Sequence, residues 1–149
     1  MKRVLLIITA AMLTLAVACT PVPNGGSGGG GKAYRIRNAD KVQFRMLDSV
    51  NALRQASGSP VVQLNAQLNA AAATHSRDMA VQNRPWHFGS DGSSPLDRVA
   101  RTGYTGSLMG EAISETFESE VETLSAWMED PNTSAVIMDP KAINMGFSW

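Results

Sequence analysis

The stretch Pro21–Gly31 separates a part of this chain that can fold from a part that cannot. It contains Asn24-Gly25-Gly26-Ser27 and then four consecutive glycines, Gly28–Gly31. Glycine loses the most backbone entropy on ordering, and this stretch offers almost no apolar surface to bury, so we expect a flexible tether. The folded part of the 149 residues therefore begins near Lys32 and suffices for one modest core.

The residues before the tether have the pattern of a targeting signal. Lys2 and Arg3 form a positively charged start, Val4–Val17 is an almost unbroken apolar run, and small residues precede Cys19. The apolar run is too short to span a bilayer comfortably, which predicts a secretory signal. We therefore divide the chain into a signal segment (residues 1–19), a tether (residues 20–38) and a folded domain (residues 39–149).

Cys19 is the only cysteine of the chain, so no disulfide can form within it. Its position directly after Ala16-Val17-Ala18 resembles the lipobox of bacterial lipoproteins, in which the cysteine is lipidated and becomes the new N-terminus. Ala16 stands where leucine is usual, and simple cleavage near Ala18 is the alternative. Lipidation of Cys19 would anchor the domain to a membrane, because each buried methylene contributes about 0.8 kcal/mol. We thus expect an extracytoplasmic protein, either anchored in the cell envelope or secreted.

The charge of the folded part argues against nucleic acid as a partner. All thirteen acidic residues lie there, whereas Lys2 and Arg3 lie in the signal, so the domain is slightly acidic. Seven of the acidic residues fall between Glu111 and Asp130 with no Lys or Arg among them. We expect most of these to form a solvated helix face, with a cation-attracting surface as the alternative.

Apolar periodicity predicts helices in the first half of the domain. The segment Lys41–Ala56 has the spacing of an amphipathic helix that ends before Gly58 and Pro60. A second helix follows Asn65, a good N-cap. The apolar face of the first helix holds Met46, Leu47, Val50 and Leu53, with Asp48, Asn51 and Arg54 elsewhere; the stripe of the second holds Leu68, Ala71, Ala72, His75 and Met79.

Shorter elements follow in the second half. Ser94 caps a third helix, which Gly103 ends in a left-handed conformation. A fourth helix, Glu118–Met128, is broken at Asp130-Pro131-Asn132, and Ser134–Met138 forms one more turn.

Two segments favour strands. Leu108–Ser114 and Ile143–Trp149 are short and mostly apolar around glycine or a small residue. Helices therefore dominate, and the sequence predicts an α+β fold with a small sheet between the helices.

A series of short motifs runs through the folded part: Leu68-x-x-Ala71-Ala72-x-x-His75-Ser76-x-Asp78-Met79-Ala80, His87-x-Gly89-x-Asp91-Gly92, Arg98, Gly103-Tyr104, Gly110-Glu111 and Trp127-Met128. No single motif is specific, but their order and spacing resemble bacterial CAP domains, from about Ala39 to Trp149. This is the cysteine-rich secretory, antigen 5 and pathogenesis-related superfamily, also called SCP domains. The resemblance implies an α-β-α sandwich with a small antiparallel sheet and a central histidine and glutamate cleft, which holds a divalent metal, often zinc, in some members.

The resemblance assigns cleft roles to two residues. His87 matches the cleft histidine before the Gly-x-Asp-Gly turn, and Glu111 matches the acidic residue of the Gly-Glu-Asn motif, although Ala112 replaces the asparagine. Thr133 stands where the second cleft histidine is expected, so the usual pair is broken. The sequence also ends at Trp149, before the last strand of family members, which leaves a short variant and an incomplete gene product as alternatives.

The residue types present offer two kinds of chemistry. Zinc prefers three or four nitrogen, sulfur or carboxylate ligands, and the chain offers His87, Glu111 and at most Asp130, so no cofactor is expected and a divalent metal would bind weakly. His87 and Glu111 also suit a metal-assisted or acid/base hydrolase. No Gly-x-Ser-x-Gly elbow occurs. His75 is expected to pack within the fold, hydrogen-bonded there.

Neighbouring residues have structural explanations. Asp91-Gly92 suits a tight turn. Arg98 lies in a helix with an apolar face, and we expect it to form a salt bridge with Asp91 or Glu111. Trp86, Phe88 and Tyr104 flank the cleft residues, where aromatic side chains suit core packing and also small hydrophobic or lipid-like ligands and peptide partners.

From these observations we expect an extracytoplasmic lipoprotein that acts as a binding or interaction module in the cell envelope. Its partners would be the membrane, through Cys19, and an envelope ligand or protein. The alternatives are the hydrolase that uses His87 and Glu111, and a degenerate or truncated domain without cleft function.

Overall fold

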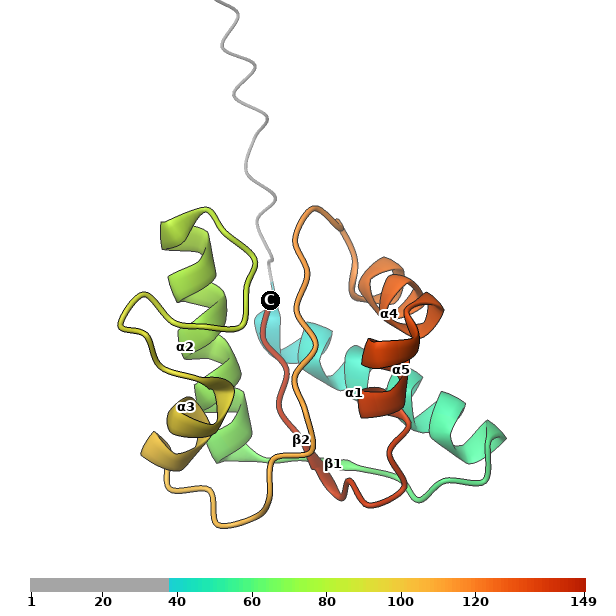
Figure 1. Cartoon of the computed structure of the whole chain (residues 1–149). Helices are drawn as coiled ribbons and strands as arrows, with labels where there is room; N and C mark the ends of the chain where they lie inside the picture. Colours follow the sequence, from blue (N-terminus) through green and yellow to red (C-terminus); the bar gives the residue numbers. More distant parts are fainter. Residues whose placement is uncertain (1–37) are drawn as a thin grey trace, which may run out of the picture. The chain divides into compact units, whose positions relative to one another are not determined.

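The structure, a computed structural model, describes residues 38–149. The predicted signal, Cys19 and nearly all of the tether lie outside the described residues. The described part holds these elements (Figure 1): α1 Ala39–Ala56, β1 Gln63–Leu64, α2 Ala66–Gln82, α3 Pro95–Arg101, α4 Glu120–Glu129, α5 Pro131–Ile137 and β2 Asn144–Met145.

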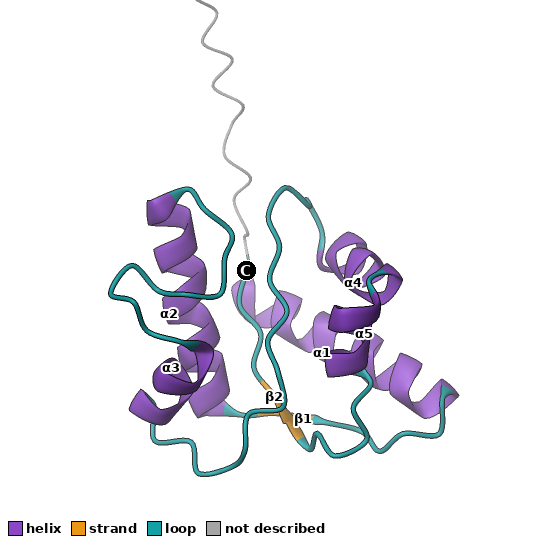
Figure 2. Cartoon of the chain, viewed as in Figure 1, coloured by secondary structure: helices purple, strands orange, loops and turns teal. Residues whose placement is uncertain are grey.

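The helices form two groups with the strands between them. α2 packs with α3 on one side, and α4 packs with α5 and with α1 on the other. The two strands and two long extended segments run between these groups (Figure 2). The α+β class with helices on both sides of a small sheet is therefore confirmed. Within residues 38–149, no helix is long and apolar enough to cross a membrane.

Local capping chemistry fixes the helix starts where the sequence predicts them. The Asn65 side chain accepts from the Leu68 N–H at 3.0 Å, which caps α2. Ser94 and Asp97 exchange hydrogen bonds at the start of α3 as a capping box. Gly103 follows α3 at φ +78°, in the left-handed region. At the break between α4 and α5, the Asp130 side chain caps α5, which is a longer helix than the single turn predicted.

The predicted strands are only partly correct. Leu108–Ser114 is extended but forms no strand, and only Asn144–Met145 of the second candidate pairs. Its partner is Gln63–Leu64, which sequence reasoning missed, and the pairing is parallel rather than antiparallel. The direction has a simple cause: four helices lie between β1 and β2 in the chain, and strands joined by such a crossover pair in parallel.

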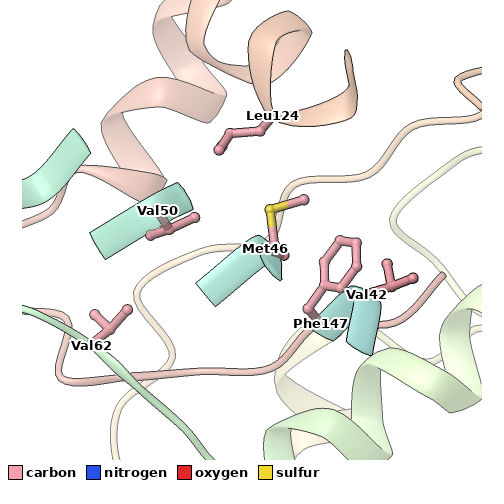
Figure 3. Close-up of a cluster of buried hydrophobic side chains, with 6 residues drawn as sticks. All are labelled: Val42, Met46, Val50, Val62, Leu124 and Phe147. Atoms are coloured by element: carbon pink, nitrogen blue, oxygen red, sulfur yellow. The ribbon is translucent and has the colours of Figure 1, made fainter. Parts of the chain in front are cut away.

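A compact apolar cluster joins α1 to the second group and to the C-terminal segment. One row of α1, Val42, Met46 and Val50, points inward at four-residue steps. Figure 3 shows these side chains with Val62, Leu124 and Phe147, the other buried members of the cluster. Trp127 packs edge-to-face on Phe147, with ring centroids 6.3 Å apart. The core therefore holds the C-terminal segment against α1 and α4.

The next residue of the inward row is an arginine, which corrects the predicted face of α1. Arg54 is fully buried, whereas Leu53 is 37% exposed. Its guanidinium donates to the carbonyl oxygens of Pro60, Ile137, Asp139 and Ala142 at 2.7, 2.7, 3.0 and 3.0 Å. The four carbonyl oxygens take up the planar fork of donors, so burial of the guanidinium charge is tolerated here.

A glycine fixes how closely β2 approaches α2. A Cβ atom on Gly146 would lie 2.2 Å from the backbone carbon of Leu68 and 2.4 Å from its oxygen. Both are backbone atoms, so the contact has no flexible side chain to relieve it. Only glycine allows the C-terminal segment to lie directly on α2.

We predict that Arg54→Lys lowers the free energy of unfolding by about 2–4 kcal/mol, because a buried ammonium group cannot reach the four carbonyls at once and loses most of these hydrogen bonds. Chemical denaturation measures the change. Arg77→Lys, at an exposed position of α2, serves as the matched control and should change stability by less than about 0.5 kcal/mol. Equal effects of the two substitutions would contradict a structural role for Arg54.

Candidate functional site

His87 and Glu111, which are 24 residues apart in the sequence, are in direct contact. The Nδ1 atom of His87 lies 2.9 Å from the Oε1 atom of Glu111. The histidine side chain is 50% exposed and the glutamate side chain 22% exposed, so the pair lies at the surface with the carboxylate on the inner side. The two residues assigned to a cleft from the sequence are therefore adjacent in space.

Arg98 holds the carboxylate from the buried side. Its Nη2 atom donates to Oε1 and Oε2 of Glu111 at 2.9 and 2.8 Å. Its Nη1 atom donates to the carbonyl oxygens of His87 and Ser93. The Arg98 side chain is only 5% exposed, so this pair is screened by solvent far less than a surface salt bridge. The predicted salt bridge of Arg98 is confirmed, and its partner is Glu111.

Asp91, the other partner considered, binds Arg101 instead at 2.6 Å. Its carboxylate also accepts from the Ser93 N–H at 2.9 Å, and Gly92 adopts φ +77°. The turn predicted for Asp91-Gly92 is thus confirmed. The hydrogen bonds from Ser93 hold the pKa of Asp91 far below its ordinary value, with Arg101 adding to the effect.

The loop that carries His87 is tied to α2 by a second carboxylate. Asp78 accepts from the Ser90 N–H at 2.7 Å and from the Gln82 side chain at 3.0 Å. The hydrogen bonds from Ser90 lower the pKa of Asp78. Position 89 of this loop has room only for glycine, because a Cβ atom there would lie 2.7 Å from Asp91 Oδ1 and from Ser93 Oγ. The backbone around His87 is therefore held by Asp78, which bonds to Ser90, and by Arg98, which bonds to the His87 carbonyl.

His75 lies next to this cluster, which sequence reasoning missed. It is 2% exposed on α2, and its Nε2 atom is 2.9 Å from the carbonyl oxygen of Trp86, so the predicted packing within the fold is confirmed. The same Nε2 atom lies 3.9 Å from Glu111 Oε1. Its Nδ1 atom is buried and has no hydrogen-bond partner among residues 38–149. The spacing of apolar residues in α2 indicates that His75 faces inward. It does not indicate that Glu111, which comes 36 residues later, lies close to it.

The flanking aromatic side chains have different surroundings. Trp86 packs edge-to-face on Phe88, with ring centroids 5.9 Å apart, and the guanidinium of Arg84 lies 3.6 Å from the centre of the Trp86 ring. Phe88 is 50% exposed. Tyr104 lies apart from this pair, and its hydroxyl accepts a hydrogen bond from the Asn144 side chain at 3.3 Å.

A cavity of about 850 Å³ lies beside the charged cluster, between the two helix groups. Glu111, His75 and Tyr104 line it, whereas His87 does not. The rest of its lining is mostly apolar and comes mainly from α2, from α4 and α5, and from the extended segments 106–117 and 143–149, with Met46, Val50, Val62 and Val99 also contributing. Its volume is in the range of sites that bind small molecules or peptides.

The residues present do not fit a zinc centre. Within residues 38–149, no three His, Cys, Asp or Glu side chains come together as a metal site would need. Both oxygens of Glu111 are engaged by Arg98. The Thr133 hydroxyl donates to the carbonyl oxygen of Trp127, and Asp130 accepts from the Asn132 N–H as the cap of α5. Glu111, Thr133 and Asp130, the groups that the sequence offered beside His87, thus each have a structural partner already.

Comparison with known proteins identifies relatives of this domain. The family model described as "CAP: Cysteine-rich secretory protein family" matches residues 47–149. The uncharacterized protein YkwD of Bacillus subtilis (strain 168) is 26% identical over 105 residues, which is 70% of this chain and 41% of that protein.

Two solved structures share the fold. An extracellular protein containing an SCP domain from Bacillus anthracis str. Ames superposes with a TM-score of 0.69 at 21% identity, over 72% of this chain and 36% of that one. An outer surface protein from Borrelia burgdorferi gives a TM-score of 0.63 at 11% identity, over 74% of this chain and 81% of that one. The chain therefore spans well under half the length of both Bacillus proteins.

We predict a coupling free energy on the order of 1–3 kcal/mol between Arg98 and Glu111 in a double-mutant cycle built from Arg98→Met and Glu111→Gln. The pair is largely buried, so removing either partner leaves the other group desolvated and unpaired. Chemical denaturation of the four proteins gives the coupling. The exposed pair Arg101 and Asp91 is the control and should give less than about 1 kcal/mol. Equal coupling in the two cycles would show that Arg98 is not a buried anchor.

Proposed function

Since the chain belongs to the CAP, or cysteine-rich secretory protein, family, we propose that it is an extracytoplasmic binding module of the cell envelope. The observation that carries this proposal is the state of Glu111. Its carboxylate is held by the buried Arg98 through both oxygens, so it is part of the scaffold of the site rather than a free base or metal ligand. The mostly apolar cavity of about 850 Å³ beside Glu111 has a size and lining that suit binding of a ligand.

The proposed location is supported by the sequence and by the relatives. A positively charged start, an apolar run and Cys19 follow one another as in a bacterial lipoprotein signal. One structural neighbour is described as an extracellular protein and another as an outer surface protein. We propose that Cys19 is lipidated and that the glycine tether spaces the domain from the membrane.

One observation favours a second candidate, an acid/base hydrolase. His87 is half exposed, and its ring contacts Glu111 at 2.9 Å, which is the arrangement of a histidine oriented by a carboxylate. In this candidate His87 would exchange protons with substrate and Glu111 would orient its ring. Zinc-assisted chemistry is disfavoured by the donor set described above.

We predict that excess zinc leaves the thermal unfolding of the purified protein unchanged relative to buffer with chelator. A site saturated at about a hundred times its Kd would add about 2.7 kcal/mol of stability, which is readily measured. His87→Ala is the matched variant. Stoichiometric zinc binding with a sub-micromolar Kd, lost in His87→Ala and accompanied by hydrolytic turnover, would overturn the binding-module proposal in favour of the hydrolase.

We predict that Cys19→Ser releases the protein from the membrane fraction of producing cells. The wild-type chain should enter the detergent phase in a Triton X-114 partition and incorporate labelled palmitate, because acyl chains on Cys19 would supply the anchoring energy. The variant should do neither. Thr20→Ala, at the position directly after the cysteine, controls for general effects on export. Membrane association that survives Cys19→Ser would show that the lipid anchor is wrong.

A further inference from the structure

Basic residues are concentrated directly after the glycine tether. Residues 32–44, which we call the basic segment, hold Lys32, Arg35, Arg37 and Lys41 against a single acid, Asp40. Residues 45–149 hold seven Lys or Arg and twelve Asp or Glu. The charge of the chain therefore changes from basic to acidic within the first turns of the folded domain.

The first turns of α1 present part of the basic segment to solvent. Lys41 is exposed, and Phe44 is 58% exposed. Residues three apart on a helix are neighbours on the same face, so these two side chains form one surface that is both cationic and apolar. Arg45 is not part of this surface charge, because Glu120 balances it within the domain. The next exposed charge on the same face is Asp48, where the cationic surface ends.

Phe44 lies on the side of α1 that faces away from the core. Val42 and Met46 point inward and lie beside Phe147 in Figure 3. Phe44 is two residues from each of them, which is about 200° around the helix axis. The C-terminal segment packs against the inward side, so the exposure of Phe44 is a property of the outer face of α1.

The tether places the basic segment close to the proposed lipid anchor. Residues 20–31 separate Cys19 from the basic segment. A glycine-rich linker of this length has a root-mean-square span of about 20 Å. With Cys19 lipidated, the basic segment is the part of the domain that is nearest in the chain to the lipid headgroups.

An anionic lipid surface matches these features together. Headgroup phosphates attract clusters of Lys and Arg next to a membrane attachment point, and an exposed aromatic ring suits the boundary between headgroups and acyl chains. The same surface repels the acidic remainder of the domain, so the charge distribution also orients it. A soluble acidic protein would match the charges, but the tether does not bring it to them.

We propose that the basic segment, with Phe44 as its apolar element, is a second membrane contact that binds anionic lipid headgroups and turns the start of α1 toward the membrane. The proposal rests on the envelope location proposed above and names the lipid class that the domain contacts. Salt at physiological concentration screens such a contact, so it assists a lipid anchor, does not replace it, and is removed by a salt wash.

The first test measures flotation with lipid vesicles of the chain from residue 19 carrying Cys19→Ser, which contains the whole described domain and has no site for a lipid. At about 50 mM salt we expect binding to vesicles of phosphatidylcholine and phosphatidylglycerol, mixed at about 2:1, to be at least about tenfold tighter than binding to pure phosphatidylcholine. At about 500 mM salt the difference should disappear, because the charges are then screened.

A matched pair of variants locates the charge that binds. Combining Arg35→Gln, Arg37→Gln and Lys41→Gln should weaken binding to the anionic vesicles at least about tenfold. The control, which should weaken it by less than about threefold, removes the same charge from exposed positions elsewhere. Its substitutions are Arg77→Gln, Arg84→Gln and Lys141→Gln.

A fluorescent label reports whether the outer face of α1 meets the lipid. Because Cys19→Ser leaves the chain without cysteine, a single new cysteine can be labelled with nitrobenzoxadiazole. The label at Phe44→Cys should show brighter, blue-shifted emission with anionic vesicles, since it enters the apolar boundary. Val81→Cys, at a position of α2 that is 86% exposed, is the control and should show no shift.

Four results would overturn the proposal. The first is equal binding to the two kinds of vesicle, the second is equal loss in the two triple variants, and the third is unchanged emission from the label at position 44. The fourth is a dimer at low salt by light scattering, which the Arg35, Arg37 and Lys41 variant converts to monomer while no vesicles bind. That outcome would assign the basic segment to the acidic surface of a second copy. All four leave the lipid anchor standing, because the Triton X-114 partition of the wild-type chain tests it separately.

Discussion

The burial of Arg54 is the interaction on which the rest of this domain depends. Its guanidinium lies at the end of the inward row of α1 and donates to four main-chain carbonyls from three separate stretches of chain. Those stretches are the turn before β1, the end of α5 and the loop that leads to β2. A domain with so few paired strands among its described residues has little sheet hydrogen bonding to define these connections. A side chain performs that task here.

Arg98 has the same role on the other side of the molecule. It is buried, it bonds to main-chain carbonyls of the His87 loop, and it adds a charge pair with Glu111. Each buried arginine thus bonds to loop carbonyls that do not take part in helix or strand hydrogen bonding. In the site this means that His87 and Glu111 are placed by a common anchor, and their contact follows from that anchor rather than from any contact between their own elements.

Much of the fold follows from local sequence chemistry, and the failures have identifiable causes. The caps at Asn65 and Ser94 and the left-handed Gly103 act through neighbouring residues, so the sequence alone indicates them. The strand at Gln63–Leu64 is two residues long and depends on a partner far along the chain, which no local pattern records.

For charged and polar residues too, local sequence predicts some positions, whereas others depend on segments far along the chain. A polar-face position is the natural prediction for Arg54, because a charged side chain is rarely buried without an acid, and only the carbonyls that other segments bring to it make its burial favourable. Motif order identifies His87 and Glu111, whereas the position of His75 beside them requires the tertiary structure.

The glycine at position 146 gives the two walls of the cavity different mechanical properties. Close seating of the backbone on α2 leaves residue 146 no room to shift, and Phe147 is locked beneath it by the apolar cluster. The opposite wall, from Gly106 onward, is fixed chiefly by the Glu111 anchor and one tryptophan contact. The wall at Gly146 is therefore held by direct backbone packing on α2, whereas the wall at Glu111 is held by side-chain bonds to Arg98 and Trp127.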